Sequence, residues 1–272
     1  MIPAAFDYVR AGSVDEAISL LGSREDAKLL AGGHSLLPAM KLRVARPSTL
    51  VDIGRLTDLS YVREDGDRVA IGALTRHHDV ANDEVLQQLC PIVAHAAGEI
   101  GDPQVRHMGT IGGSVAHGDP AGDMPTVLLA LDAEFVVQGP AGTRTIAAGD
   151  FFTSLFETEL AADDVLTEIR VPKATAGWSF MKFQRRAQDW AIVGVSAVRS
   201  NGRVHVGLTN MGLTPLRATG VEDALGSGAD PAAAAARADE GTAPPDDAFG
   251  SAEYRRELAK VLVRRALEEA MA

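Results

Sequence analysis

The first strong hydrophobic pattern of the chain begins after Ser13. Apolar residues then recur every three or four positions, which places them on one face of a helix. Ser13 can accept a hydrogen bond from the first turn and Glu16 can return one, so the two residues form a capping box. Gly22 can end the helix. The positions on the expected buried face are Val14, Ala17, Ile18 and Leu21.

A shorter apolar run, KLLAG at 28–32, predicts a strand directly after this helix. A turn with two glycines, a short helical piece and a further strand near 49–53 come next. This order of elements predicts a compact unit of β-α-β type over residues 1–56.

Strands and helices alternate over residues 57–175. Apolar runs predict strands at 67–75, 134–139, 144–148 and 164–172. Helical periodicity predicts one long helix at 82–100 and another at 123–133. We expect this segment to be the second part of an N-terminal domain that ends near residue 175.

A different pattern fills residues 176–272. Three strands follow one another at 178–186, 191–200 and 203–212, and Asn201-Gly202 between the last two is typical of a type I′ hairpin turn. This local antiparallel order predicts a separate C-terminal domain in an α+β protein. Helices are expected at 229–241, capped by Asp230, and at 251–272, with an apolar side that consists of Tyr254, Leu258, Val261 and Leu262.

Composition and net charge argue against nucleic-acid binding and against a membrane span. The 272 residues are 46% apolar and carry a net charge of −11. An acidic chain lacks the excess of Lys and Arg that binds nucleic acid. No apolar run is long enough to cross a membrane, and the start of the chain lacks the pattern of a signal peptide, so we expect a cytoplasmic protein.

Cys90 is the only cysteine. One thiol forms no intramolecular disulfide and cannot supply the several thiolates of an iron–sulfur cluster. Its apolar neighbours predict a buried, inert side chain.

Two glycine-rich stretches carry the strongest chemical signal. The first, LLAGGHSLLPAMKLR, runs from Leu29 to Arg43. Gly32 and Gly33 let the backbone approach a ligand closely, and successive N–H groups in such a turn form a concavity for an anion such as a diphosphate. A plain strand-to-helix turn that needs glycine would also explain this stretch.

The second stretch, HMGTIGGSVAHGDPAGDMP, runs from His107 to Pro125. It repeats the combination of glycines and hydroxyls, with Asp123 near a helix start, where it could cap the helix or bind a ribose hydroxyl. Two such turns could hold opposite sides of one dinucleotide. Neither the P-loop motif nor the G-x-G-x-x-G fingerprint occurs, which indicates a different scaffold.

Several histidines invite a metal or acid–base interpretation. His77 and His78 are adjacent, so they point in different directions, and a polar turn is the simpler explanation. His117 and Asp119 lie inside the second glycine-rich stretch, where we expect them to support the loop.

These stretches, together with IGALTRHHDV at 71–80 and DVLTEIRVP at 164–172, resemble the FAD-binding medium subunit of the molybdenum hydroxylases. This is the family of carbon monoxide dehydrogenase and xanthine dehydrogenase, and the resemblance covers nearly the whole chain. It implies a two-part FAD-binding domain of the p-cresol methylhydroxylase type over 1–175, followed by a small C-terminal domain over 176–272.

The resemblance also implies which residues bind FAD, without a covalent bond from His34. Those that would surround the diphosphate are Leu30, Ala31, Gly32, Gly33, His34, Ser35, Leu36 and Leu37, with Thr110, Ile111, Gly112, Gly113 and Ser114. Those that would contact the rest of the cofactor are Ile100, Asp123, Leu166, Lys182 and Trp190. Trp190 is equally well explained as a core aromatic.

The function that the resemblance implies is electron transfer. A small partner subunit would carry two [2Fe–2S] clusters and a large one the molybdenum cofactor, in a dimer of heterotrimers, and electrons would pass through FAD to an external acceptor. Two alternatives stay open: a stand-alone FAD oxidoreductase, and a nucleotide-binding or assembly module without flavin. The substrate and the final acceptor are not readable from this chain.

Overall fold

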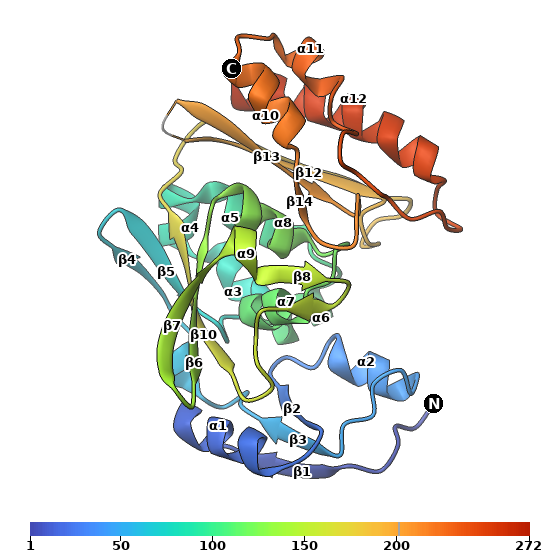
Figure 1. Cartoon of the computed structure of the whole chain (residues 1–272). Coiled ribbons are helices and arrows are strands. Elements are labelled where there is room, and N and C mark those ends of the chain that lie inside the picture. Colours follow the sequence, from blue (N-terminus) through green and yellow to red (C-terminus); the bar gives the residue numbers. More distant parts are fainter. Residues whose placement is uncertain (201) are drawn as a thin grey trace.

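The computed structural model describes residues 1–200 and 202–272, arranged as three tiers (Figure 1). The N-terminal tier is a parallel sheet in the order β1-β3-β2. Its strands are β1 (Asp7–Arg10), β2 (Ala27–Leu30) and β3 (Thr49–Asp52). Two helices, α1 (Val14–Ser23) and α2 (Leu36–Lys41), connect them.

The capping box that begins α1 is present in a slightly altered form. The Ser13 hydroxyl accepts a hydrogen bond from Glu16 N at 3.1 Å. The Glu16 carboxylate accepts one from Gly12 N at 2.7 Å, one residue earlier than the usual partner. Ala17, Ile18 and Leu21 are buried as predicted.

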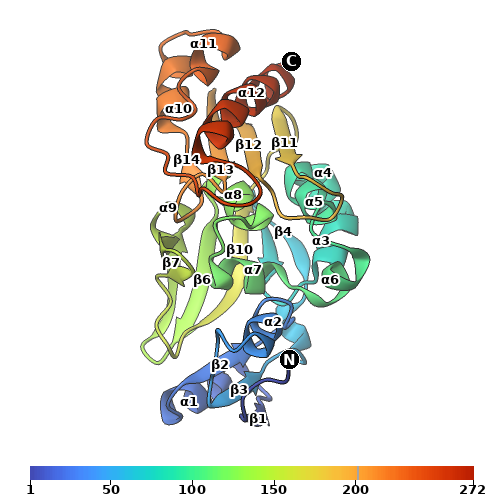
Figure 2. The same ribbon diagram turned by 90° about the vertical axis from the view of Figure 1, so that its right-hand side faces the viewer.

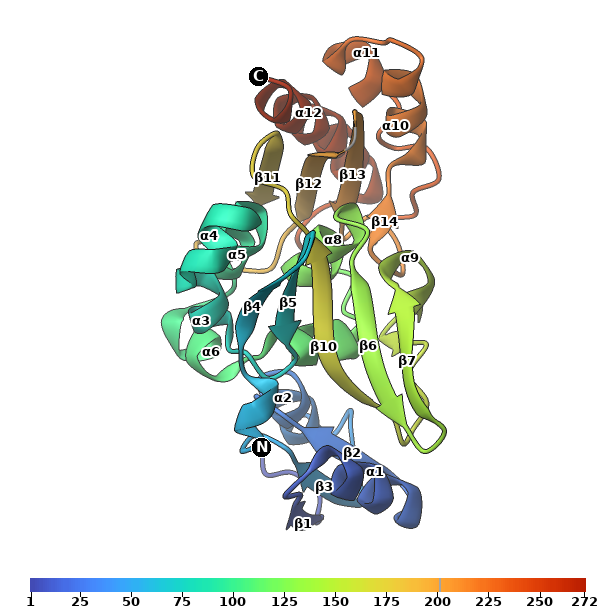
Figure 3. The same cartoon turned by 90° about the vertical axis from the view of Figure 1, so that its left-hand side faces the viewer.

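The central tier is an antiparallel sheet in the order β4-β5-β10-β6-β7. Its strands are β4 (Val62–Asp65), β5 (Arg68–Gly72), β6 (Glu134–Gly139), β7 (Gly142–Ala147) and β10 (Val165–Pro172). Figure 3 shows the sheet face-on, with helices behind it and beside β4. These helices are α3 (His77–Asn82), α4 (Glu84–Leu89), α5 (Pro91–Gly98), α6 (Pro103–Met108), α7 (Ile111–His117) and α8 (Asp123–Ala130).

Short elements complete the central tier. Thr57–Leu59 form a 3₁₀ turn before β4, and Ala148–Phe151 form α9. A hairpin of β8 (Phe152–Ser154) and β9 (Glu157–Thr158) leads toward β10.

The single helix predicted over 82–100 is wrong, because the structure has two helices there. α4 ends at Leu89 and α5 starts at Pro91, with Cys90 in a non-helical conformation between them (φ −151°, ψ 62°). Proline has no N–H to continue the helix and disfavours a helical residue before it, so the chain breaks at this point. Cys90 is fully buried, and burial raises its pKa to about 12.

The C-terminal tier has four antiparallel strands rather than the three expected. They are β11 (Trp178–Phe183), β12 (Val193–Ser200), β13 (Arg203–Thr209) and the short β14 (Leu216–Arg217). Helices α10 (Thr219–Gly226), α11 (Pro231–Ala235) and α12 (Ala252–Ala270) cover this sheet (Figure 2). Asn201 of the predicted hairpin turn lies outside the described residues.

The predicted apolar side of the last helix is partly wrong. Tyr254 and Val261 are each 46% exposed. The buried side instead includes Arg255, whose guanidinium is bonded to Asp247 at 2.7 Å and to the Ile192 carbonyl. Because these partners satisfy the charge, the helix can turn a different face to the sheet than a count of apolar residues indicates.

α8 joins the central and C-terminal tiers. All eight of its residues are buried, since it packs on the central tier on one side and on β12 and β13 on the other. The predicted domain boundary near residue 175 falls between β10 and β11, and division of the chain there stays a prediction. Of the helices in the described residues, none is long and apolar enough to cross a membrane.

Candidate cofactor site

A cavity of about 800 Å³ opens between the N-terminal and central tiers and reaches the C-terminal tier. It brings together nearly all of the residues that the sequence singled out. The predicted residues that line it are Leu30, Ala31, Gly32, Gly33, His34, Ser35, Leu36, Ile100, Thr110, Gly112, Gly113, Ser114, Asp123, Leu166, Lys182 and Trp190. Leu37 and Ile111 do not line it, and Ile111 is fully buried in the core of the central tier.

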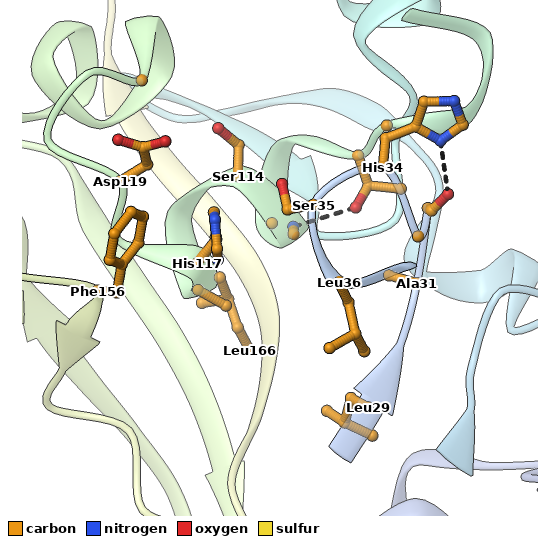
Figure 4. A pocket seen from close by; sticks show the side chains of 18 of the residues that line it. Leu29, Ala31, His34, Ser35, Leu36, Ser114, His117, Asp119, Phe156 and Leu166 are labelled. Atoms are coloured by element: carbon orange, nitrogen blue, oxygen red, sulfur yellow. Dashed lines mark hydrogen bonds between the residues drawn. The ribbon is translucent and has the colours of Figure 1, made fainter. Parts of the chain in front are cut away.

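The first glycine-rich stretch presents unpaired backbone N–H groups to this cavity. Among the described residues, no acceptor is bonded to the N–H groups of the five successive residues 32–36. Gly33 has φ +76°, a left-handed conformation that turns neighbouring amides to the same side. The His34 ring turns back, with Nδ1 3.1 Å from the Gly32 carbonyl (Figure 4).

The second stretch differs from the expectation of another open loop, because it is the first turn of α7. Ile111 N donates to Thr75 O, and Gly112 N donates to Ala73 O. Gly113 N is capped by the Thr110 hydroxyl at 3.0 Å (Figure 4). The first N–H groups of α7 are therefore already satisfied, and this stretch offers hydroxyls, above all that of Ser114, rather than amides.

Two glycines are required by close packing of the backbone. A Cβ on Gly32 would lie 2.2 Å from the Met108 carbonyl oxygen, and one on Gly112 would lie 2.5 Å from the Ala73 Cβ. Backbone therefore packs directly on backbone at these points, between two tiers at Gly32 and within the central tier at Gly112.

Asp123 and Lys182 form a buried ion pair at the cavity wall. Lys182 Nζ donates to Asp123 Oδ2 at 2.7 Å and to the Glu99 carbonyl at 3.0 Å. Both side chains are less than 10% exposed. The Asp123 carboxylate accepts no N–H from its own helix, so it does not cap α8, and its Oδ1 is buried without a partner in the described residues.

Burial raises the pKa of Asp123 to about 6, although Lys182 opposes the shift. A buried carboxylate oxygen without a donor is costly, and this oxygen is free to accept a hydrogen bond from a ligand in the cavity.

Trp190 lies at the rim of the cavity and is 63% exposed. The interpretation as a core aromatic is therefore wrong. Gln188 and Asp189 line the same rim, and Gln188 has a left-handed backbone (φ +71°). The cavity wall is apolar at Ile100, on the turn between α5 and α6, and at Leu166, on β10.

Phe156 is a wall residue that sequence reasoning missed. It lies at the turn of the β8–β9 hairpin with φ +57°, and its ring is 5.0 Å from that of His117. Figure 4 shows Phe156, His117 and Asp119 on one side of the cavity and His34 and Leu36 on the other. Only the hairpin contact brings Phe156 here, and no local sequence signal marks it.

The paired histidines have different surroundings. His77 is buried, and desolvation lowers its pKa to about 4, whereas His78 stacks on His107 with ring centres 3.9 Å apart. In residues 1–200 and 202–272, no group of three or more His, Cys, Asp or Glu side chains could hold a metal ion.

The family models indicate which cofactor the protein binds. Residues 4–174 match the FAD-binding domain in molybdopterin dehydrogenase, and residues 178–270 match the C-terminal domain of the CO dehydrogenase flavoprotein. The chain belongs to this flavoprotein family. The resemblance found in the sequence is thereby confirmed, as is the fold class of a FAD-binding domain followed by a C-terminal domain.

Relatives of this flavoprotein match along their whole length. The carbon monoxide dehydrogenase medium chain of Hydrogenophaga pseudoflava is 44% identical over 100% of the chain and 99% of the relative. The glyceraldehyde dehydrogenase medium chain of Sulfolobus acidocaldarius is 39% identical, with 99% of each covered. The nicotine 6-hydroxylase medium subunit of Paenarthrobacter nicotinovorans is 38% identical, over 98% of the chain and 97% of the relative.

Solved structures agree with the fold of this flavoprotein. Carbon monoxide dehydrogenase from Hydrogenophaga pseudoflava superposes with a TM-score of 0.95 at 44% identity, over 100% of the chain and 99% of that structure's chain. Quinoline 2-oxidoreductase from Pseudomonas putida superposes with a TM-score of 0.92 at 31% identity, with 100% and 99% covered.

The cavity of this flavoprotein fits a flavin dinucleotide. The unpaired N–H groups of residues 32–36 suit a diphosphate, and the unpaired Oδ1 of Asp123 suits a hydroxyl or N–H of the ligand. The cavity also combines apolar wall with a few polar groups, as cofactor sites do.

Proposed function

We propose that this chain is the FAD-carrying electron-transfer subunit of a molybdenum hydroxylase. The observation that carries the proposal is the run of unbonded N–H groups at residues 32–36, all of which line the cavity. Bound FAD supplies one- and two-electron redox chemistry, so it would link partner iron–sulfur clusters to an external acceptor.

The chain's own residues would bind and orient the cofactor. The amides of residues 32–36 would donate to the diphosphate, and the Ser114 hydroxyl would bind it from the facing wall. Lys182 orients the Asp123 carboxylate, which would accept a hydrogen bond from the cofactor with its free oxygen. Trp190 would lie against the ring system at the rim and restrict its contact with water.

We further propose that the cofactor is held without a covalent bond. The His34 ring is turned toward the Gly32 carbonyl rather than into the cavity centre. Acid precipitation should therefore release all of the flavin into the supernatant. Flavin that stays with the precipitated chain would contradict this assignment.

The metal centres of the complex would lie on partner chains. One cysteine cannot ligate an iron–sulfur cluster. Relatives are named medium chains or complex subunits, and one related structure is titled a Cu,Mo-CO dehydrogenase. We therefore propose a small iron–sulfur partner with two [2Fe–2S] clusters and a large molybdenum partner, in a dimer of heterotrimers.

The substrate would be selected by the large partner. Relatives with 38–44% sequence identity to this chain are named for carbon monoxide, glyceraldehyde and nicotine. Sequence similarity in this subunit therefore does not indicate which substrate the complex oxidises. Carbon monoxide, purines, other heterocycles and aldehydes stay open for this complex.

Reduction experiments separate this function from a stand-alone FAD oxidoreductase. The purified chain should bind one FAD and stay oxidised when carbon monoxide, a purine or an aldehyde is added alone. Addition of the iron–sulfur and molybdenum partners with substrate should then bleach the flavin bands in the visible spectrum. Bleaching by an organic substrate without partners would favour the stand-alone enzyme. A colourless chain that cannot be reconstituted with FAD would favour a non-flavin module.

A further inference from the structure

Trp190 is a large, exposed aromatic side chain that needs something to hold it in place. It follows a tight turn in which Arg186 pairs with Asp189 at 3.0 Å, and Gln188 is left-handed. The turn projects away from the C-terminal sheet between β11 and β12. Packing alone therefore fixes little of a side chain that is 63% exposed.

Asn210 bonds the backbone just after this tryptophan. Its side-chain amide Nδ2 donates to the Ala191 carbonyl at 2.9 Å and to the Ile192 carbonyl at 3.4 Å. Ala191 is only 2% exposed, so the chain is anchored directly beyond Trp190.

The same residue also bonds a second segment at the cavity, which contains Pro120. Asn210 N donates to the Pro120 carbonyl at 2.8 Å, and Pro120 lies between the cavity-lining residues Asp119 and Gly122. Asn210 has φ +62°, a left-handed conformation that asparagine adopts more readily than most residues. This conformation lets one residue reach both segments, although Asn210 itself does not line the cavity.

We propose that Asn210 is the positioning residue that holds Trp190 over the cofactor cavity and ties it to the 119–122 segment. The proposal rests on the proposed function, because the ligand that Trp190 would cover is FAD. Loss of the amide would leave the cavity wall and the diphosphate contacts in place. The tryptophan would lose its fixed position over the flavin.

The chain has only two tryptophans, which makes this position measurable. In a Trp178→Phe variant of the full chain, Trp190 is the sole tryptophan. Its ring should strongly quench the emission of bound FAD, because a tryptophan in contact with the flavin donates an electron to the excited ring system and this transfer falls steeply with distance. A Trp190→Phe variant is the matched control, since the remaining Trp178 lies on β11 beside His95, outside the cavity.

Two substitutions in the Trp178→Phe background test Asn210. Asn210→Asp keeps the size and the backbone bond to Pro120 but replaces the donor with an acceptor that repels the two carbonyls. Asn210→Gly keeps access to positive φ and removes the amide. Both variants should still bind FAD, and both should lose most of the quenching of flavin emission by Trp190.

Unchanged quenching in either folded variant would overturn the positioning role. Failure of the Trp178→Phe chain itself to bind FAD would instead refute the proposed function, so the two failures are distinguishable. Asn210→Gln should restore part of the quenching if the amide donor is what matters.

Discussion

The two glycine-rich stretches look alike in sequence but differ in what their backbones do. In the first, the N–H groups of residues 32–36 face the cavity without a partner. In the second, the N–H groups of Ile111 and Gly112 are bonded to carbonyls of the segment after β5, and that of Gly113 is bonded to Thr110.

The difference separates two uses of glycine. Gly33 provides a left-handed turn that exposes amides to a ligand. Gly112 provides close packing, because a Cβ there would overlap Ala73. Equal glycine content therefore does not mean equal access to a phosphate, and the hydrogen-bond partners of each N–H decide which use applies.

The largest effect is expected at Asp123, near the end of the second stretch. Asp123→Ala leaves the Lys182 ammonium buried without its partner, which typically costs about 3–5 kcal/mol of unfolding free energy. Denaturant unfolding with and without FAD measures this cost. A loss confined to FAD affinity, with stability unchanged, would show that the pair matters only to the ligand.

The pH dependence of stability gives a milder test at the same position. The pKa of Asp123 is raised from 3.8 to about 6 in the folded chain. Its contribution to stability is therefore complete below pH 3.8 and is lost as pH rises through about 6. The substitution Asp123→Asn should remove this dependence of the unfolding free energy on pH, as denaturant unfolding measured across the same pH range would show.

The contact between the stretches is tested next by Gly32→Ala. The added Cβ would lie 2.2 Å from the Met108 carbonyl, so backbone must move, at a cost of about 3 kcal/mol. Both unfolding free energy and FAD affinity should fall, because the turn that carries the free amides is displaced. Retention of both would mean that the two tiers are not in backbone contact here.

Matched alanines at Gly33 and Gly113 test the comparison directly. Gly33→Ala forces a Cβ into a left-handed conformation, which costs about 1–2 kcal/mol and should lower FAD affinity roughly tenfold. On Gly113, a Cβ would lie 2.7 Å from the Thr110 hydroxyl, so that side chain must shift. The Gly113 N–H is bonded within the chain and not available to the ligand, so affinity in Gly113→Ala should fall less than about threefold. Titration of each chain with FAD gives both values, and the reverse order would invert our assignment of amide donors.

The smallest effects are expected at the hydroxyls of the second stretch. The Ser114 hydroxyl has no hydrogen-bond partner within the described chain, so Ser114→Ala should leave stability within about 0.5 kcal/mol. FAD affinity should fall by the worth of one hydrogen bond, about 1 kcal/mol. Thr110→Val is the counterpart, because it removes the cap of α7 and should lower stability by about 1 kcal/mol. Calorimetric unfolding and FAD titration of both variants measure these effects. A loss of stability in Ser114→Ala, or a loss of FAD affinity alone in Thr110→Val, would contradict the assignment.

Local patterns predicted much of this fold. The capped helix after Ser13, β10 before Pro172 and the successive strands of the C-terminal sheet were all readable, because periodicity and caps act over a few residues. The break at Cys90 was also readable in principle, since Pro91 is a local signal.

The features that local patterns did not predict depend on contacts between residues far apart in the chain. Carbonyls at Ala73 and Thr75 satisfy N–H groups almost 40 residues later, and no local pattern indicates this pairing. Asp247 and the Ile192 carbonyl bury Arg255, which shifts the contact face of α12. The set of cavity residues came from the family resemblance, and their individual contacts with FAD stay predictions.

The shared position of α8 limits how this protein can be shortened. Its Thr126 hydroxyl is bonded to that of Thr209 at 2.8 Å, and Gly207 fits closely against the same threonine. A fragment cut after residue 175 would uncover this side of the helix, directly beside the Asp123 that Lys182 would no longer neutralise. A minimal flavin carrier therefore has to keep the C-terminal sheet together with the helices that bury its apolar face.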